Sequence, residues 1–231
     1  TPTALAEIRK NFGEELAFLV DAVTKVEKVK SSGTDRALES VRKMFMAVAE
    51  DIRVVIIKLA DRLHNMETAD WLSREKRERI AGETLSLYAP LAERLGMWNL
   101  KARLEDLSMK YLYPQEYEKI TSEVKKIAPE RERYLKKIAP QVEAELSKEN
   151  IKLLELSYRA KHLYSIWQKL KRYDGDWTHL ADLIALRIIV PDIKDCYAAV
   201  GIIHKLWKPV PGKFKDYIAL PKPNGYQSLH T

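Results

Sequence analysis

Cysteine is nearly absent from this sequence, which has one cysteine in 231 residues. A single cysteine excludes a disulfide framework and a zinc site built from cysteines. No apolar run approaches the roughly 20 residues that a helix needs to span a bilayer, so we expect no membrane contact. With no signal peptide, no repeat and no low-complexity tract, the sequence predicts a cytoplasmic protein. Because the first residue is Thr1 rather than methionine, we expect a piece of a longer protein.

Acidic residues are missing where basic residues gather. The chain carries 40 Lys and Arg against 33 Asp and Glu, a formal net charge of +7. Residues 158–172 hold five Lys or Arg and no acid, and residues 204–224 hold five Lys against Asp216 alone. A basic excess confined to two short segments indicates a local anionic ligand rather than a coat for nucleic acid. The plainer alternative is a pair of solvated faces.

The spacing of apolar residues divides the chain. Glycine is scarce in the first 147 residues, and the helical periodicity there predicts an all-helical part with Gly96 as a helix stop and Pro114 in a first turn. After Asn150, expected strands at 151–156, 186–190 and 216–220 alternate with helices at 160–173 and 194–207. This alternation indicates an α/β or α+β domain, and the predicted fold class of the whole chain is α+β. The expected domains are 1–115 and 151–231, joined by exposed helices at 116–150.

One polar constellation lies in the helical part. Asp61, Asn65 and Thr68 follow the spacing i, i+4, i+7, so they share one face of a helix. A carboxylate, an amide and a hydroxyl in line suit a hard metal and a polar ligand. An ordinary capping and hydrogen-bonding surface is the alternative that the spacing alone favours, because metal sites usually need three or more protein ligands.

A second constellation begins the basic stretch. The helix after Arg159 and Lys161 has an apolar stripe on one side and His162, Ser165 and Lys169 on the other. Basic residues at the start of a helix that follows a strand are well placed to bind phosphate. An amphipathic surface helix is the alternative. Asp182 precedes the next expected strand, where a carboxylate can hold Mg²⁺ between phosphates or simply cap a turn.

The third constellation is a loop near the end of the sequence. Lys215, Lys222 and His230 can bind phosphates, while Asn224 offers hydrogen bonds to a base edge and Tyr226 a ring to stack on. The prolines and the Asn-Gly pair restrict the backbone of this loop. A plain hairpin turn at Asn-Gly needs no surrounding lysine, tyrosine and histidine, so we favour the binding hypothesis.

Together these segments resemble the long RelA/SpoT-type (p)ppGpp synthetase/hydrolases of the bacterial stringent response. The resemblance covers nearly the whole chain and is carried by residues 58–68, 159–169, 182–187, 195–208 and 211–231. It implies an all-helical HD-type hydrolase domain followed by a nucleotidyltransferase-like α/β synthetase domain with a mixed sheet, both truncated. It also implies a ribosome and tRNA as partners, through C-terminal modules that lie outside this sequence.

The resemblance implies a role for each site residue. In the hydrolase, which would remove the 3′-pyrophosphate of (p)ppGpp with Mn²⁺, Asp61 matches a metal ligand, and Asn65 and Thr68 match the nucleotide pocket. In the synthetase, which would move pyrophosphate from ATP to GDP or GTP with Mg²⁺, Asp182 matches the magnesium aspartate. The ATP side matches Arg159, Lys161, Ser165 and Lys169, and the guanine-nucleotide side matches Lys222, Asn224, Tyr226 and His230. Three further residues, His162, Lys215 and Tyr217, are expected to bind nucleotide.

Some expected parts of the family pattern are missing. The remaining hydrolase metal ligands and the Glu-Asp pair that activates water are expected upstream of Thr1, and a second synthetase acid downstream of Thr231. Glu67 stands where many relatives have arginine. Two alternatives to a bifunctional enzyme therefore stay open: a synthetase with a degenerate hydrolase domain, and a basic module that binds RNA or the ribosome.

Overall fold

The computed structural model describes residues 2–27, 51–177, 180 and 183–231 of the chain. It divides them between two compact units, Thr1–Ala92 with Met97–Leu112, and Glu93–Gly96 with Tyr113–Thr231. The predicted stripe of Val41, Met44, Phe45 and Val48 lies outside the described residues. Within the described ranges, no helix combines the length and the apolar character needed to cross a bilayer.

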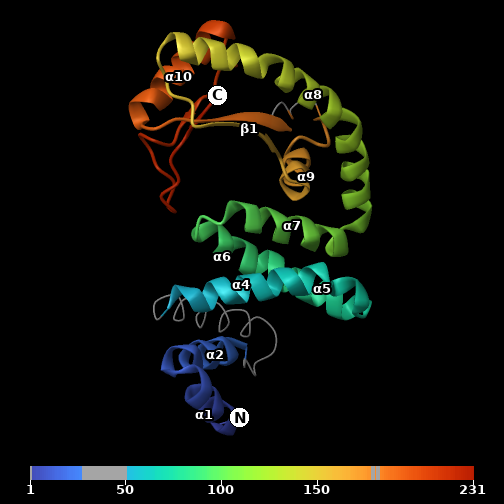
Figure 1. Ribbon diagram of the computed structural model, residues 1–231. Helices are drawn as coiled ribbons and strands as arrows, with labels where there is room; N and C mark the ends of the chain where they lie inside the picture. Colours follow the sequence, from blue (N-terminus) through green and yellow to red (C-terminus); the bar gives the residue numbers. More distant parts are fainter. Residues whose placement is uncertain (1, 28–50, 178–179, 181–182) are drawn as a thin grey trace. The chain divides into compact units, whose positions relative to one another are not determined.

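The first unit is helical throughout its described residues (Figure 1), as its periodicity predicts. Its core is formed by buried side chains of α4 and α7, among them Leu59, Met66, Leu104 and Met109. Asp51 caps the start of α4, since its carboxylate accepts a hydrogen bond from the Arg53 amide at 2.9 Å. The elements of this unit are α1 (Pro2–Phe12), α2 (Glu14–Glu27), α4 (Ile52–Glu67), the 3₁₀-helix η1 (Ala69–Trp71), α5 (Arg74–Glu83), the π-helix η2 (Thr84–Tyr88), the first four residues of α6 (Ala89–Arg94) and α7 (Trp98–Leu112). The last two residues of α6, Glu93 and Arg94, are assigned to the second unit.

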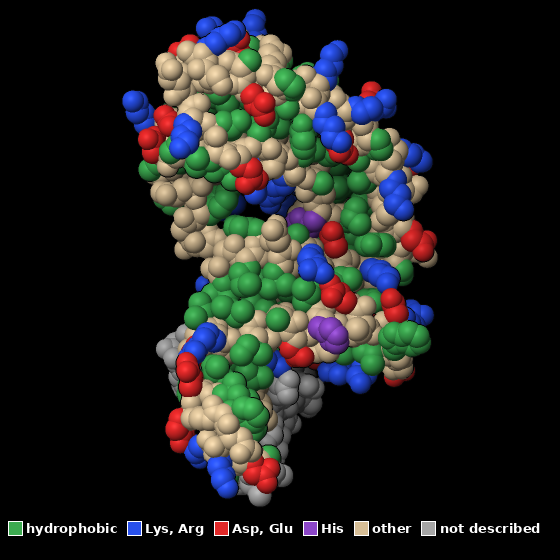
Figure 2. Space-filling model, in the orientation of Figure 1, with side chains coloured by type: hydrophobic (Ala, Val, Ile, Leu, Met, Phe, Trp, Pro, Cys, Tyr) green, Lys and Arg blue, Asp and Glu red, His purple; other side chains and the backbone are tan. Residues whose placement is uncertain are grey.

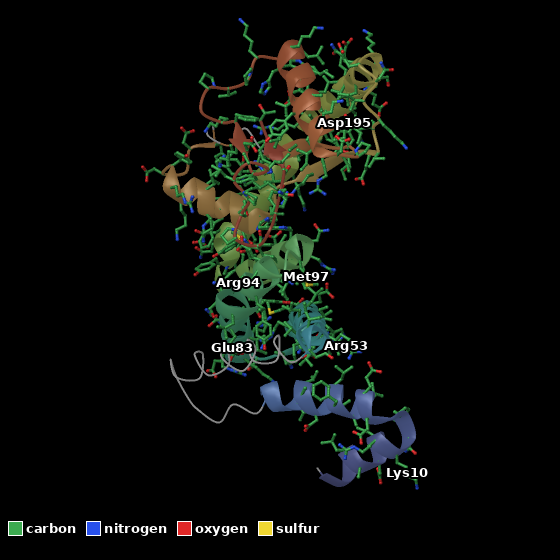
Figure 3. The ribbon with its side chains drawn as sticks, turned by 90° about the vertical axis from the view of Figure 1, so that its left-hand side faces the viewer. Lys10, Arg53, Glu83, Arg94, Met97 and Asp195 are labelled. Atoms are coloured by element: carbon green, nitrogen blue, oxygen red, sulfur yellow. The ribbon has the colours of Figure 1, made fainter. Side chains whose placement is uncertain are left out.

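The predicted helix stop at Gly96 is confirmed. The turn that it makes lies between Arg94 and Met97, both labelled in Figure 3. Gly96 has a φ of +72°, the left-handed conformation that glycine adopts without steric cost. The Met97 amide donates to the Ala92 carbonyl at 2.8 Å, which satisfies one of the carbonyls at the end of α6.

The second unit is built along one long helix, α8 (Pro114–Lys148). Figure 1 shows that α8 is bent, with α10 (Ile193–Leu206) beside its C-terminal part and α9 (Leu163–Arg172) beside its N-terminal half. The prolines expected to divide residues 121–150 into separate helices, Pro129 and Pro140, lie inside α8. A proline removes one backbone hydrogen bond and bends a helix, and here the helix continues past both.

Two short antiparallel pairs of strands complete the second unit. β1 (Glu155–Ala160) pairs with β2 (Ile184–Ile189), and β3 (Lys215–Asp216) pairs with β4 (Leu229–His230). This mixture of helices and small sheets confirms the α+β prediction. The mixed sheet that the resemblance implies is not found among the described residues, where both pairs of strands are antiparallel. The apolar core of the unit lies between α8, α10 and the β1–β2 pair, and it consists of Val142, Leu146, Ile151 and Ala199 with partly buried neighbours that include Trp207.

Two expected strands were placed wrongly. The first was predicted at 151–156 but begins at Glu155, because Asn150 takes a left-handed conformation and Ile151 closes the end of α8 by donating to the Leu146 carbonyl at 3.0 Å. Ile151 then fills the core instead of a strand. The strand predicted at 216–220 stops at Asp216, since the chain turns immediately afterwards.

Candidate functional site

The loop between β3 and β4 gathers aromatic rings around a lysine. The ammonium of Lys222 lies 4.8 Å from the ring centre of Tyr217 and 5.2 Å from that of Tyr226. His230 packs edge-on against both rings, at 5.2 Å from Tyr217 and 5.9 Å from Tyr226. The Tyr226 hydroxyl is 2.9 Å from Nε2 of His230. We call Tyr217, Lys222, Tyr226 and His230 the ring cluster.

The backbone of the loop is folded by its own turn residues. The Gly225 amide donates to the Lys222 carbonyl at 2.8 Å, which closes a turn with Pro223 and Asn224 at its centre. Gly225 has a φ of +75°. Oδ1 of Asn224 accepts from the Tyr226 amide at 3.2 Å, and its Nδ2 donates to the carbonyl of Glu93, a residue of the same unit, at 3.0 Å. Asn224 therefore shapes the turn, and its amide oxygen and nitrogen can each make another hydrogen bond.

Positive charge converges on His230 from three directions. Lys215 faces it across the β3–β4 ladder, Lys222 comes from the loop, and Arg159 comes from β1. Burial first, and then the charges of Lys222, Arg159 and Lys215, lower the pKa of His230, although part of the ring stays exposed. Cations that disfavour the protonation of a histidine create a positive potential around it, and a positive potential attracts an anion. The ring cluster with Arg159 and Lys215 thus combines a phosphate-binding charge with flat rings on which a base can stack.

The lowered pKa of His230 predicts a dependence of stability on pH. The unfolded chain takes up a proton on this histidine at pH values where the folded chain does not, so folding weakens as the pH falls through the ordinary histidine range. We expect the second unit to unfold at a lower temperature at pH 5 than at pH 7. Thermal unfolding of the chain and of a His230→Gln variant checks this, because the difference between the two pH values should shrink in the variant.

A second group of predicted residues lies at the start of α9. His162 is the N-terminal cap residue of α9, and its Nε2 is 2.8 Å from the Ser165 hydroxyl one turn later. The Lys161 amide donates to the Leu183 carbonyl at 2.8 Å, which fixes the chain between β1 and α9. Lys169 lies in the last turn of α9. The predicted amphipathic character is confirmed: Ile166, Trp167 and Leu170 are buried.

Asp182 lies outside the described residues. The described residues on either side of it, Leu180 and Leu183, are buried. The guanidinium of Arg131 in α8 donates to the Leu180 carbonyl at 2.7 Å. Sequence reasoning missed this contact, because Arg131 is one of many charged residues in α8.

In the first unit, Asp61, Asn65 and Thr68 lie on the exposed surface of α4 and the residue that ends it. The Asp61 carboxylate is 3.3 Å from the ammonium of Lys58, which is buried. The Thr68 hydroxyl donates to the His64 carbonyl at 2.9 Å, a capping bond. Among the described residues, no three His, Cys, Asp or Glu side chains come together in a way that would hold a metal ion. The described part of this face therefore holds no complete set of three such ligands around Asp61.

Sequence reasoning also missed Asp216 and Tyr197 as part of the loop. Both residues lie in segments that carry the family resemblance, Tyr197 in 195–208 and Asp216 in 211–231, but the sequence predicts no contact between them. In the structure, the Tyr197 hydroxyl donates to Oδ2 of Asp216 at 2.9 Å. The available signal was the isolation of Asp216 among lysines, because a lone carboxylate in a basic segment often has a structural partner.

Comparison with known proteins matches both units. Residues 1–98 match the HD domain, and residues 158–231 match the region found in RelA/SpoT proteins. The chain is 50% identical over its whole length to a guanosine-3′,5′-bis(diphosphate) 3′-pyrophosphohydrolase of Aquifex aeolicus, covering 33% of that protein. It is 48% identical over 97% of its length to a GTP pyrophosphokinase of Myxococcus xanthus, covering 30% of it. It is 45% identical over its whole length to the bifunctional (p)ppGpp synthase/hydrolase SpoT of Escherichia coli, covering 33% of it.

The chain spans about a third of the length of these curated relatives. The two domain matches occur in the order that the sequence predicts, with the HD domain first. The second match begins at Tyr158 in β1 and includes α9, the ring cluster and Arg159. The chain is therefore similar to RelA/SpoT proteins, with an HD domain match in its N-terminal half and a RelA/SpoT-region match in its C-terminal third.

Proposed function

We propose that this protein makes and degrades (p)ppGpp. The observation that carries the proposal is the ring cluster with Arg159 and Lys215, which offers a guanine nucleotide two aromatic rings and several cations in one place. The names of the relatives, a GTP pyrophosphokinase and a (p)ppGpp pyrophosphohydrolase among them, supply the two reactions. We place both reactions in the cytoplasm, where their nucleotide substrates are available.

The proposed synthesis transfers pyrophosphate from ATP to the 3′-hydroxyl of GDP or GTP. The 3′-hydroxyl oxygen attacks the β-phosphorus in line and releases its proton to solvent, the bond between the β-phosphorus and the α,β-bridging oxygen breaks, and AMP leaves with that oxygen. Arg159, Lys161 and Lys169 stabilise the negative charge that develops on the phosphate oxygens, with His162 and Ser165 on the same ATP side. Lys215, Lys222 and His230 bind the phosphates of the acceptor, and Tyr226 stacks on its base with Tyr217 and Asn224 beside it.

The proposed hydrolysis removes the 3′-pyrophosphate of (p)ppGpp in the first unit. Asn65 and Thr68 contact the nucleotide from the exposed face of α4. We propose divalent metal ions for both reactions, Mn²⁺ near Asp61 for hydrolysis and Mg²⁺ near Asp182 for synthesis. When bound, each ion would neutralise phosphate charge. The ribosome and tRNA remain proposed partners of the longer protein.

Selectivity between guanine and adenine nucleotides tests the proposal. We expect the chain to bind GDP about tenfold or more tightly than ADP, because hydrogen bonds to a base edge discriminate between bases by about 1–3 kcal/mol. Isothermal titration measures both affinities. Saturating α,β-methylene ATP, whose α–β bridge is not cleaved, keeps ADP out of the ATP site. Equal affinity for GDP and ADP would contradict the proposal.

Titrations with RNA, compared with those of GDP, distinguish the proposed enzyme from a module that binds RNA. A basic module that binds RNA would bind any RNA, with an affinity that falls steeply as salt rises. On the face drawn in Figure 2, Lys and Arg side chains are mixed with Asp and Glu and form no continuous stripe. We therefore expect weak RNA binding beside GDP binding that persists at 0.3 M salt. Tight binding of unrelated RNAs without selectivity for GDP would favour the RNA-binding module.

A further inference from the structure

Asp216 is the only acidic residue of the segment 204–224, yet the described residues that donate hydrogen bonds to it are all neutral. Oδ1 accepts from the backbone amides of Ile218 at 2.9 Å and Ala219 at 2.8 Å. Oδ2 accepts from the Tyr197 hydroxyl at 2.9 Å. One carboxylate therefore closes a turn with one oxygen and joins that turn to α10 with the other.

The position of this carboxylate ties it to the ring cluster. Asp216 stands between Lys215 and Tyr217 in the sequence, and in the β3–β4 ladder it faces Leu229, next to His230. The Tyr217 amide donates to the Ser228 carbonyl at 2.9 Å, which continues the pairing just past β3. The Asp216 turn then ends the strand and sends the chain toward Lys222. The directions of Lys215 and Tyr217 consequently depend on the backbone that Asp216 fixes.

We propose that Asp216, held from α10 by Tyr197, is a positioning residue for the guanine nucleotide. It fixes the backbone from which Lys215 and Tyr217 reach the phosphates and the base, and it does not itself touch the substrate. This inference rests on the proposed function, because it assigns Asp216 to the same guanine-nucleotide side. Tyr197 contributes to this positioning, since its hydroxyl joins the turn to α10, a helix that packs on the core of the unit.

The hydrogen bonds explain why Asp216 is a poor candidate for a general base. Its three donors stabilise the carboxylate form and lower the pKa of Asp216, with the Ala219 amide as the largest contribution. A general base works best with a pKa near the working pH. The same contact raises the pKa of Tyr197, because a phenolate beside the carboxylate would lose its hydrogen bond and repel it.

The test compares Tyr197→Phe, Asp216→Ala and the double variant in the full protein, assayed for pyrophosphoryl transfer. We expect Tyr197→Phe to raise KM for GDP about threefold to tenfold, because it removes one hydrogen bond to a charged group. Asp216→Ala should raise it further, and the double variant should equal Asp216→Ala, since the hydroxyl acts through the carboxylate. KM for ATP, kcat and the unfolding temperature should change little. Asp216→Asn, which keeps an oxygen for the two amides, should recover most of the loss.

Matched controls are available in the same unit. Tyr134→Phe removes an exposed hydroxyl from α8, and Asp174→Asn removes the charge of an exposed carboxylate after α9 while tolerating the left-handed φ of +48° at this position. Neither should change KM for GDP. Amide hydrogen exchange at Ile218 and Ala219 gives a readout that needs no nucleotide, and it should be faster in Asp216→Ala.

The outcomes separate this inference from the proposed function. An unchanged KM for GDP in both single variants overturns the positioning role. A parallel change in KM for GDP, KM for ATP and unfolding temperature also overturns it, because that pattern belongs to a purely structural residue. If the unaltered protein neither binds GDP nor uses it, the proposed function fails, and faster exchange at Ile218 and Ala219 would still support the turn that Asp216 holds.

Discussion

An Asp182→Ala variant of the protein is expected to lose pyrophosphoryl transfer to GDP by about 10²–10³-fold or more, while its hydrolysis of (p)ppGpp persists. The reason is that Asp182 is the acid proposed to act near the ATP phosphates, where the other predicted groups are cations or neutral. The main chain beside it is anchored by buried Leu180 and Leu183 and by Arg131. Loss of the carboxylate should therefore remove charge from the site without unfolding the unit.

The reciprocal variant is Asp61→Asn, which should lose hydrolysis and keep transfer. Asparagine preserves the shape of the side chain beside the buried Lys58, so an effect on activity is separable from one on folding. Both reactions are followed with labelled nucleotide on thin-layer plates, in protein of the full length that the gene encodes. Transfer that survives Asp182→Ala removes this residue from the reaction, and hydrolysis that survives Asp61→Asn removes Asp61. Asp174→Asn serves as the control for loss of a surface carboxylate, because asparagine tolerates the left-handed φ of +48° at this position.

Local patterns in the sequence predicted the helices well. Residues 160–173 were expected to be an amphipathic helix, and α9 occupies 163–172 with Ile166 and Leu170 buried. The prediction of this helix succeeds because the helical period of apolar residues can be recognised within one continuous stretch of sequence. The strand at 151–156 failed because an apolar run does not reveal whether it joins a sheet or fills a core. Ile151 is apolar because it packs at the end of α8.

The candidate site was only partly predictable for a related reason. Lys215, Lys222, Tyr226 and His230 are close in sequence, so their grouping in one loop could be expected. The contribution of Arg159 to the charge around His230 depends on how β1 lies beside the loop, which no local pattern gives. The role of Asp216 could not be predicted from its neighbours in the sequence alone. Two of its hydrogen bonds depend on the turn that follows it, and the third depends on α10, which begins more than twenty residues earlier.

The ring cluster yields the second large effect, on binding of the guanine nucleotide. Tyr226→Ala is expected to weaken GDP binding about tenfold to a hundredfold, because stacking of a base on an aromatic ring contributes about 1–3 kcal/mol. Tyr226→Phe keeps the ring and removes the hydroxyl beside His230. It should therefore retain most of the affinity. Isothermal titration of GDP into each variant measures the difference.

Lys222→Met separates charge from packing in the same cluster. Methionine keeps an apolar stem of similar length against the rings of Tyr217 and Tyr226 but removes the ammonium. We expect the affinity for GDP to fall about tenfold, since hydrogen bonds from a charged group to phosphate are stronger than hydrogen bonds between neutral groups. The pKa of His230 should rise toward its ordinary value, because one of the three cations that lower it is gone. A nuclear magnetic resonance titration of His230 follows this directly. If the pKa and the GDP affinity both stay unchanged in Lys222→Met, the lysine neither faces His230 nor binds the nucleotide, and the phosphates must be held elsewhere.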